Sequence, residues 1–420
     1  MPWYLGNGSM MSQGFLGWGI IPLAVWSLLW TGLALWYSAR RGEKWWFISY
    51  IRNIRDHLSC LCRESVQTKK ILSSALAMKT WKKLKANPEL WQRYFVREKV
   101  SHAIRFFFEN EKFHEIETPI LIPHPPAESY LDVFETTLLD RHRNPTKAYL
   151  STSPEIPLKK LMVAGLGNCY SLTKSFRNME TQSHTHNPEF TILEWYRVGA
   201  NYMDIMKDCE ELLLSIAGGN TLTYQGKKIG ISAPWERITV ATAFKKYAGI
   251  DFDAFLNEKE ARVIAAKKKY NVELHTTWEE LYNQIFLNEI EPHLGQGKPT
   301  IVYEFPGELA ALAKKKASDP RVAERFEFYI AGLELGDAYS ELTDPVEQEA
   351  RFNTELAEVK RLGKTSYEYD QDFLEALKVG LPTCSGIAVG VDRLVMLFAD
   401  TTNIADTLFF PAVEEFPLSE

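Results

Sequence analysis

The stretch SFRNMETQSHTHNPEFTILEWYR, residues 175–197, holds side chains whose types and spacing could do chemistry. Its pattern predicts a strand, a polar loop that begins at Arg177, and a second strand. Side chains alternate across a strand, so one face of the second strand should hold Phe190, Ile192, Glu194 and Tyr196. A carboxylate on such an apolar face needs a cation, which is either a neighbouring arginine or a positively charged ligand.

A second acidic region ends at Glu341. An Ala-Gly turn at 331–332 predicts a β-hairpin in which Tyr329 lies opposite Glu334. Glu327 is then diagonal to Glu334, on the order of 7 Å away. Two carboxylates this close repel each other unless a cation lies between them. Mg²⁺ that bridges to substrate phosphates would fit these oxygen ligands, and two solvated glutamates on an exposed sheet face are the alternative.

The segment 384–399, CSGIAVGVDRLVMLFA, predicts a short strand, a turn at Gly390 and an apolar helix with Arg393 in its first turn. An arginine there opposes the helix dipole, unless the arginine and the helix start both face an anion such as phosphate. A structural arginine that pairs with Asp392 or a more distant acid is the alternative. No GxxxxGK[ST] motif occurs, so arginines and a sheet would hold a nucleotide here.

A helix start is predicted at Ser153-Pro154-Glu155, where the serine can cap the helix and the carboxylate suits the positive end of its dipole. Glu155 can therefore be structural as well as a ligand.

The elements that position these residues belong to a chain of 420 residues with 45% hydrophobic content, enough for one large core. The net charge of -6 gives no general attraction to nucleic acid. The five cysteines are scattered without a CxxC pair, so neither a disulfide framework nor a zinc site is predicted. A reducing compartment fits best.

The N-terminal region has a different composition. No charged residue or histidine precedes Arg40, and residues 14–37 form an apolar run long enough to cross a bilayer. We therefore predict a transmembrane helix at about 14–37. The basic residues that follow place the remaining chain in the cytoplasm, anchored to the membrane.

The predicted domains are an appendage with a linker at 1–77 and a catalytic domain at 78–420, which carries a helical insertion at about 250–296. If translation starts at Met78, the protein would be fully cytoplasmic.

Three features resemble motifs 1, 2 and 3 of the class II aminoacyl-tRNA synthetases. They are the helix and strand that end at Pro119, the strand-loop-strand with Arg177, and the strand-helix with Arg393. HNPEFTILEWY and FEFYIAGLELGDAYSEL are similar to the lysyl branch. The resemblance covers Met78 to about Pro411 and implies an α+β fold, an antiparallel sheet flanked by helices, in a homodimer.

Within this class the layout is closest to the elongation factor P lysine ligase, a truncated paralogue of lysyl-tRNA synthetase, because no N-terminal OB-fold is evident. Ser153 and Ala388 also match that paralogue, where the tRNA ligases usually have Ala and Gly. The implied acceptor is a lysine of elongation factor P, and tRNA is the less favoured partner. A tRNA ligase without its anticodon domain, a membrane enzyme that makes lysyl-lipid and an inactive binding module are the alternatives.

The resemblance implies that ATP, with Mg²⁺, activates lysine or β-lysine as an adenylate. Arg177 would bridge the amino-acid carboxylate and the α-phosphate, and Arg393 would hold the γ-phosphate, so these two are the implied catalytic residues. Mg²⁺ would bind Glu327 and Glu334. The implied ATP-binding residues are Arg177, Glu180, Asn187, Glu334, Gly390 and Arg393.

For the amino acid, Glu155 would take the α-amino group and Glu194, Tyr196 and Glu341 would receive the side-chain ammonium. The implied substrate-binding residues are Ser153, Glu155, Glu194, Tyr196, Glu341 and Ala388. Two positions depart from the family pattern. Met179 stands where an acid is usual, with Glu180 as its substitute, and Asp337 adds a negative charge where Asn is usual.

Overall fold

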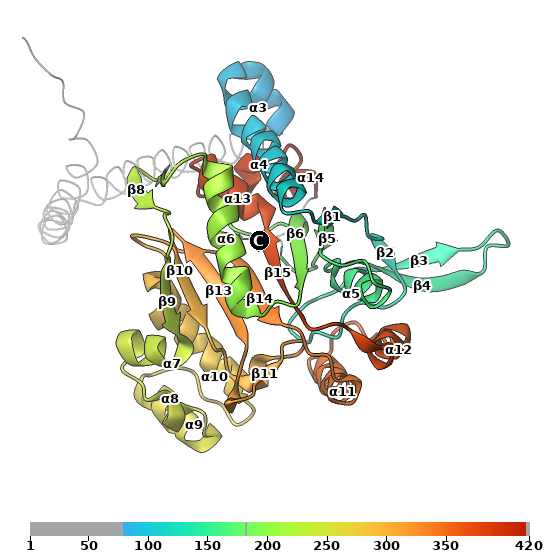
Figure 1. The fold of residues 1–420 in the computed structure, drawn as a ribbon, viewed down its shortest axis with the longest axis vertical. Coiled ribbons are helices and arrows are strands. Elements are labelled where there is room, and N and C mark those ends of the chain that lie inside the picture. Colours follow the sequence, from blue (N-terminus) through green and yellow to red (C-terminus); the bar gives the residue numbers. More distant parts are fainter. Residues whose placement is uncertain (1–78, 181–182, 417–420) are drawn as a thin grey trace, which may run out of the picture. The chain divides into compact units, whose positions relative to one another are not determined.

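The computed structural model describes residues 79–180 and 183–416. An eight-stranded sheet organises them, in the order β1-β5-β6-β15-β14-β13-β10-β9 (Figure 1). Neighbouring strands are antiparallel except for the parallel pairs β1/β5 and β9/β10 at the two edges. The strands are β1 His114–Glu115, β5 Cys169–Phe176, β6 Glu189–Val198, β9 Glu236–Thr239, β10 Thr300–Tyr303, β13 Arg325–Ile330, β14 Leu333–Ser340 and β15 Cys384–Gly390.

Three smaller sheets accompany the large one. The first has the order β2-β4-β3, and the other two are the hairpins β7/β8 and β11/β12. These strands are β2 Leu121–Ile122, β3 Glu135–Leu139, β4 Pro145–Leu150, β7 Thr221–Tyr224, β8 Lys227–Gly230, β11 Lys315–Lys316 and β12 Asp319–Ala323.

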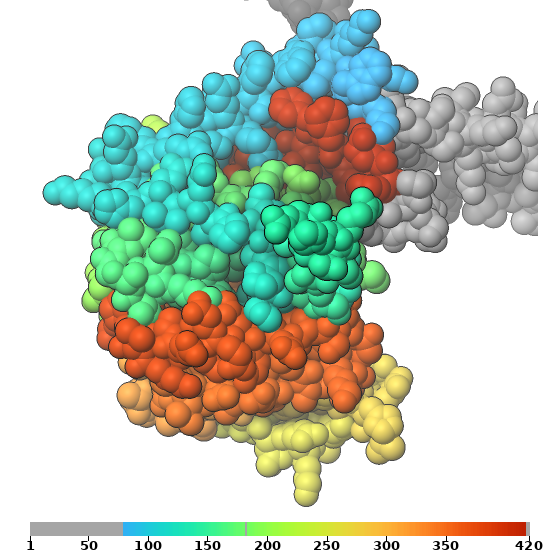
Figure 2. All heavy atoms as spheres, turned by 90° about the vertical axis from the view of Figure 1, so that its right-hand side faces the viewer, coloured from blue at the N-terminus to red at the C-terminus, as the bar shows by residue number. Residues whose placement is uncertain are grey.

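Helices α4 (Trp91–Asn110), α6 (Tyr202–Ala217) and α13 (Val391–Phe398) pack on one face of the large sheet. Leu193 and Trp195 of β6 point into the resulting core. The other helices near the sheet are α3 Thr80–Ala86, η1 Pro88–Leu90, α5 Glu155–Val163, η5 Gly307–Leu309, α11 Pro345–Arg361, α12 Gln371–Gly380, η6 Ile404–Thr407 and α14 Ala412–Glu415. In Figure 2 α11 and α12, in orange to red, form a layer beneath the green and cyan residues.

A second, helical core lies beyond β9 and β10 and contains the segment predicted as an insertion. Its elements are α7 Val240–Ala243, η2 Phe244–Ala248, α8 Phe252–Phe255, α9 Glu258–Lys267, α10 Trp278–Ile285, η3 Phe286–Ile290 and η4 Glu291–His293. Aromatic side chains such as Phe244 and Tyr282, whose rings lie 5.3 Å apart, fill this core.

Local sequence signals explain where the elements start and stop. Asn201 caps α6, because its side chain accepts a hydrogen bond from the backbone N–H of Met203 while Asp204 accepts one from Asn201. The helix ends at Gly218, whose positive φ of 63° suits glycine.

The predicted turn at 331–332 joins β13 and β14, and Tyr329 lies opposite Glu334 as predicted. Both turn residues have positive φ, 56° and 78°, as a two-residue hairpin turn requires. An irregularity after Phe328 shifts the register, so Asp337 rather than Gly336 lies opposite Glu327 across the strands. Glu334, opposite Tyr329, keeps its diagonal position to Glu327, but the regular ladder assumed from the sequence did not predict the neighbouring Asp337.

The predicted fold class needs one correction. Among residues 79–180 and 183–416, no helix is both long enough and apolar enough to cross a bilayer. The predicted span at 14–37 lies outside the described residues, and we withdraw the transmembrane helix from the fold and the membrane anchor from the localisation.

Candidate active site

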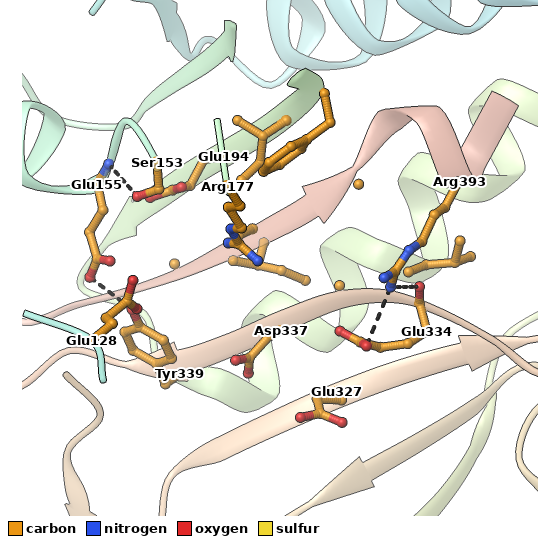
Figure 3. Close-up of a pocket in the computed structure, with 18 of the residues that line it drawn as sticks. Glu128, Ser153, Glu155, Arg177, Glu194, Glu327, Glu334, Asp337, Tyr339 and Arg393 are labelled. Atoms are coloured by element: carbon orange, nitrogen blue, oxygen red, sulfur yellow. Dashed lines mark hydrogen bonds and ion pairs between the residues drawn. The ribbon is translucent and has the colours of Figure 1, made fainter. Parts of the chain in front are cut away.

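A pocket opens on the sheet face opposite α4, α6 and α13. Strands β6, β13, β14 and β15, the start of α5 and the loop after β5 line it (Figure 3). It gathers nearly all residues that the sequence singled out, namely Ser153, Glu155, Arg177, Glu180, Asn187, Glu194, Tyr196, Glu327, Glu334, Asp337, Ala388, Gly390 and Arg393. Glu341 is not among its lining residues.

One end of the pocket is built to accept a positive charge. Glu194 is only 2% exposed, and its Oε1 accepts a hydrogen bond from the Tyr196 hydroxyl at 2.5 Å. Its Oε2 is buried and has no hydrogen-bond partner among the described residues. Burial, and then the nearby charge of Glu155, raise the pKa of Glu194 well above its usual value. A cationic ligand would satisfy this oxygen.

Lys159 occupies the space beside this end and was not predicted. Its Nζ lies 2.5 Å from Glu155 Oε1 and 2.5 Å from Glu341 Oε2, and it sits 5.5 Å from the centre of the Tyr339 ring. Burial alone would lower the pKa of Lys159, but the two carboxylates raise it. Glu341 therefore faces a cation of the protein, and its expected contact with a substrate ammonium is at most indirect in this structure.

Arg177 extends into the middle of the pocket, between the Glu155 and Arg393 ends (Figure 3). Its guanidinium carbon lies 5.2 Å from the centre of the Phe190 ring, and its buried Nε has no hydrogen-bond partner in the part of the chain that the structure describes. The backbone N–H of Arg177 donates to Pro188 O, which closes the loop at its base. Because a buried guanidinium that lacks a hydrogen-bond partner is costly, an anionic ligand would stabilise Arg177.

Arg393 marks the far end of the pocket. It donates hydrogen bonds to the carbonyl oxygens of Thr185 and Glu334, and its Nη1 lies 3.3 Å from Glu334 Oε2. His186 Nε2 lies 2.6 Å from its Nη2, and burial together with Arg393 lowers the pKa of His186 to about 4. His186 is therefore neutral at pH 7 and can accept a hydrogen bond from the arginine.

Of the structural alternatives for Arg393, the pair with its neighbour Asp392 is absent among the described residues, whereas the pair with a more distant acid is present, with Glu334 at 3.3 Å. Asp392 instead pairs with Arg97 of α4 and accepts a hydrogen bond from the backbone N–H of Thr191. This contact ties the predicted motif 1 helix to β6 and leaves Arg393 facing the pocket.

The carboxylates predicted to bind metal, Glu327 and Glu334, already have partners within the protein. Glu327 accepts hydrogen bonds from Arg325 at 2.9 Å and from Tyr329 at 2.6 Å, and Arg325 also contacts Asp337 at 2.9 Å. Over the described residues, no group of three or more His, Cys, Asp or Glu side chains is arranged to hold a metal by itself. Each carboxylate oxygen has two acceptor sites, so Glu327 and the half-exposed Glu334 still fit a cation that takes further ligands from phosphates.

Met179 and Glu180 lie in the loop after β5 and point in different directions. Met179 has a left-handed φ of 65° and is 77% exposed, so it turns away from the pocket, whereas Glu180 lines it. Burial raises the pKa of Glu180, and the charges of Arg177 and Arg393 oppose that shift. Glu180 therefore lies where it can contact a ligand, and its role as the substitute for an acid at position 179 stays a prediction.

Four remaining predicted residues have clear local environments. The Ser153 hydroxyl accepts a hydrogen bond from the N–H of Glu155, but α5 starts at Glu155 with Pro154 as its N-cap residue, one position later than predicted. Ala388 lies between Glu194 and Asp337 on the adjacent strands, and Gly390 precedes α13. Both amide ends of Asn187 are used, since it donates to Glu189 O and accepts from the N–H of Ala412.

Sequence reasoning missed Arg325, Lys159 and Glu128. The spacing of the first two could have predicted them. Arg325 stands two residues before Glu327 and so shares its strand face, and Lys159 stands four residues after Glu155 and so lies beside it on a helix. Glu128 follows a Pro-Pro-Ala segment without periodicity, so no pattern placed it in the pocket.

An antiparallel sheet with helices on one face, a pocket on the other, and arginines from a strand-loop and from a strand-helix define a class II synthetase catalytic domain. The chain belongs to the family of class II tRNA synthetases (D, K and N), which matches residues 75–414. The match confirms the resemblance to class II synthetases that the three motifs indicated.

Several relatives are more than one third identical to this chain over the region that aligns. The lysine-tRNA ligase of Moorella thermoacetica is 37% identical over 334 residues, which cover 78% of this chain and 66% of that protein. Those of Pelotomaculum thermopropionicum and Listeria monocytogenes are 36% and 37% identical over 337 and 332 residues, with 78% of this chain and 65% of each relative covered. The chain thus spans slightly less than two thirds of these relatives. Residues 8–52 match a separate family of unknown function.

Proposed function

We propose that this protein is an ATP-dependent ligase that activates lysine as lysyl adenylate and transfers it to an acceptor. The observation that carries the proposal is the pair of unsatisfied charges in one pocket, the Glu194 carboxylate at one end and the Arg177 guanidinium in the middle. Lysine offers an ammonium and a carboxylate to match them. The lysine-tRNA ligase names of the relatives support the same substrate.

In the proposed reaction the lysine carboxylate attacks the α-phosphorus of ATP, the adenylate forms and pyrophosphate leaves. Arg177 would stabilise the negative charge that develops between carboxylate and α-phosphate, and Arg393 would hold the γ-phosphate. Glu194 and Tyr196 would hold the side-chain ammonium. The role of the protein is to position the reactants and stabilise charge, without a covalent enzyme intermediate.

We further propose that Glu327 and Glu334 hold Mg²⁺ when ATP is bound. The ion would neutralise phosphate charge. Arg325 would keep Glu327 in place through its 2.9 Å contact.

For the acceptor, we propose tRNA, as the names of the relatives suggest. A second candidate is a lysine of elongation factor P. Ser153 and Ala388 favour it, because both line the pocket and match that paralogue at positions where the tRNA ligases usually differ. Such small changes discriminate between substrates by only about 1 to 3 kcal/mol, so they carry less weight than the overall similarity.

Pyrophosphate exchange with lysine and β-lysine, followed by transfer of labelled lysine to lysine tRNA or to elongation factor P, tests the proposal. We expect exchange with lysine and labelling of tRNA. Absence of exchange with either amino acid would rule out the ligase function. Labelling of the protein factor alone would replace tRNA by the second candidate.

A further inference from the structure

We propose that Glu128 is a second carboxylate for the α-amino group of the substrate, acting together with Glu155. This inference rests on the proposed lysine activation and names a residue that the sequence patterns did not single out. Glu128 belongs to the segment between β2 and β3, outside the three synthetase motifs.

The position of Glu128 supports this role. It lines the pocket, and Figure 3 shows its carboxylate on the same side as Glu155 and the Tyr339 ring. Glu155 uses its Oε1 for both Lys159 and Tyr339, at 2.5 and 2.8 Å. Lys159 therefore neutralises part of the charge of Glu155, and a second carboxylate adds the negative charge that an ammonium requires.

The segment that carries Glu128 is held firmly. The N–H of Ser129 donates to Glu355 of α11 at 2.8 Å, and Lys364 donates to the carbonyl oxygens of Ser129 and Tyr130 at 2.9 and 3.0 Å. The Tyr130 hydroxyl donates to Glu128 Oε1 at 2.9 Å. These contacts fix the carboxylate in the pocket before any ligand arrives, as a binding group requires.

The distribution of charge assigns the α-amino group rather than the side-chain ammonium to Glu128. Glu194, 2% exposed and with its unpartnered Oε2 in the same pocket, is the match for the side-chain ammonium. Glu128 lies close enough to both Arg177 and Glu155 for their charges to affect it. Arg177 is the proposed partner of the substrate carboxylate, and the α-amino group is one carbon away from that carboxylate.

Burial and the charge of Glu155 raise the pKa of Glu128 to about 7. Lysine affinity should then increase between pH 6 and pH 8, because the carboxylate must be ionised to bind an ammonium. The titratable and charged groups that face Glu128 are Tyr130, Glu155, Arg177, Tyr339, Glu355 and Tyr367.

The test compares the Kd values of lysine and of 6-aminohexanoate, which is lysine without its α-amino group, by calorimetry on the full chain. Glu128→Gln should weaken lysine binding about tenfold or more and change 6-aminohexanoate binding less than about twofold. The increase in lysine affinity from pH 6 to pH 8 should be lost in this variant. Tyr130→Phe should give a smaller loss in the same direction.

Glu135→Gln, on the exposed strand β3, is the matched control and should leave both Kd values unchanged. Equal weakening of both ligands by Glu128→Gln, or unaltered lysine binding, would overturn the role of Glu128 while leaving lysine activation intact. Failure of the unaltered protein to bind lysine would overturn both proposals.

Discussion

Lys159 and Glu341 form an ion pair beneath the pocket, with 2.5 Å between Nζ and Oε2 and exposed fractions of only 1% and 0% for the two side chains. The same ammonium contacts Glu155, so one internal cation holds two carboxylates that would otherwise repel each other. Through this pair Glu341 helps to hold Lys159, and with it Glu155, in place next to the pocket. Glu194, by contrast, lines the pocket, so a ligand can reach its buried Oε2.

Replacing this cation should therefore damage the fold as well as the site. Removing one partner of a buried ion pair costs about 3–5 kcal/mol, because the other charge stays buried and unpaired. We expect Lys159→Met to lower the free energy of unfolding in urea by this amount, and Lys159→Met combined with Glu341→Gln to recover part of it. A single variant as stable as the unaltered protein would contradict the pairing.

Glu194→Gln should have opposite effects on stability and on binding. Burying this carboxyl group with one oxygen unpartnered is costly in the ligand-free protein, so the free energy of unfolding of the variant should be higher. Lysine affinity should fall about 10- to 100-fold, because a hydrogen bond to a charged group contributes about 1.5–3 kcal/mol. Calorimetry and urea unfolding measure the two quantities. Glu189→Gln, exposed on the same strand, is the control and should change neither.

Arg393→Ala should reduce pyrophosphate exchange by about 10²–10³-fold or more, because the arginine is the proposed partner of the γ-phosphate. The fold should remain intact, since the Arg393 side chain lies at the pocket and contacts the carbonyl oxygens of Thr185 and Glu334, His186 and the Glu334 carboxylate. Circular dichroism checks the fold, and Arg93→Ala on α4 serves as a surface control. Normal exchange by the variant would remove Arg393 from the phosphate role.

Gly386→Ala tests the packing beneath the Tyr196 ring. A Cβ at position 386 would overlap this ring and lie 3.0 Å from the carbonyl oxygen of Trp195. We expect a loss of about 1–3 kcal/mol in stability and weaker lysine binding, as the ring is displaced. At Gly219 an added Cβ meets no atom within 4 Å, so Gly219→Ala should be nearly neutral in the same melting experiments. Equal melting temperatures for the two variants would argue against the close packing.

The stability of the ligand-free protein should depend on pH through Glu327. Burial, opposed by Arg325, raises the pKa of this carboxyl to about 8 in the folded protein, against an ordinary value of 4.5. The folded state then holds a proton that the unfolded chain releases, so this contribution to stability is lost as the pH rises through about 8. Melting temperatures should therefore increase from pH 9 to pH 7. Glu327→Gln should flatten the profile, and an unchanged slope in that variant would exclude Glu327 as its source.

Local periodicity predicted the parts of the site that lie on regular elements. The alternation along β6 places Leu193 and Trp195 in the core and Glu194 and Tyr196 in the pocket. The Ala-Gly turn correctly set Tyr329 opposite Glu334. In both cases the side-chain direction follows from the backbone pattern of a few consecutive residues.

The parts that sequence reasoning missed depend on contacts between distant segments. The register shift after Phe328 depends on how β13 and β14 pair, and it brings Asp337 opposite Glu327. Glu128 reaches the pocket because Glu355 and Lys364, more than 200 positions later, hold its segment in place. No window of consecutive residues contains that information.

The C-terminal helix α14 also has a consequence for synthesis on the ribosome. Glu414 accepts hydrogen bonds from the backbone N–H and the hydroxyl of Thr80, 334 positions earlier, and the N–H of Ala412 donates to Asn187 in the pocket loop. The start of α3 and the support of this loop therefore gain these partners only after α14 has been translated. A nascent chain that stalls before residue 412 would lack both contacts, so the pocket loop would stay without this support until α14 emerges from the ribosome.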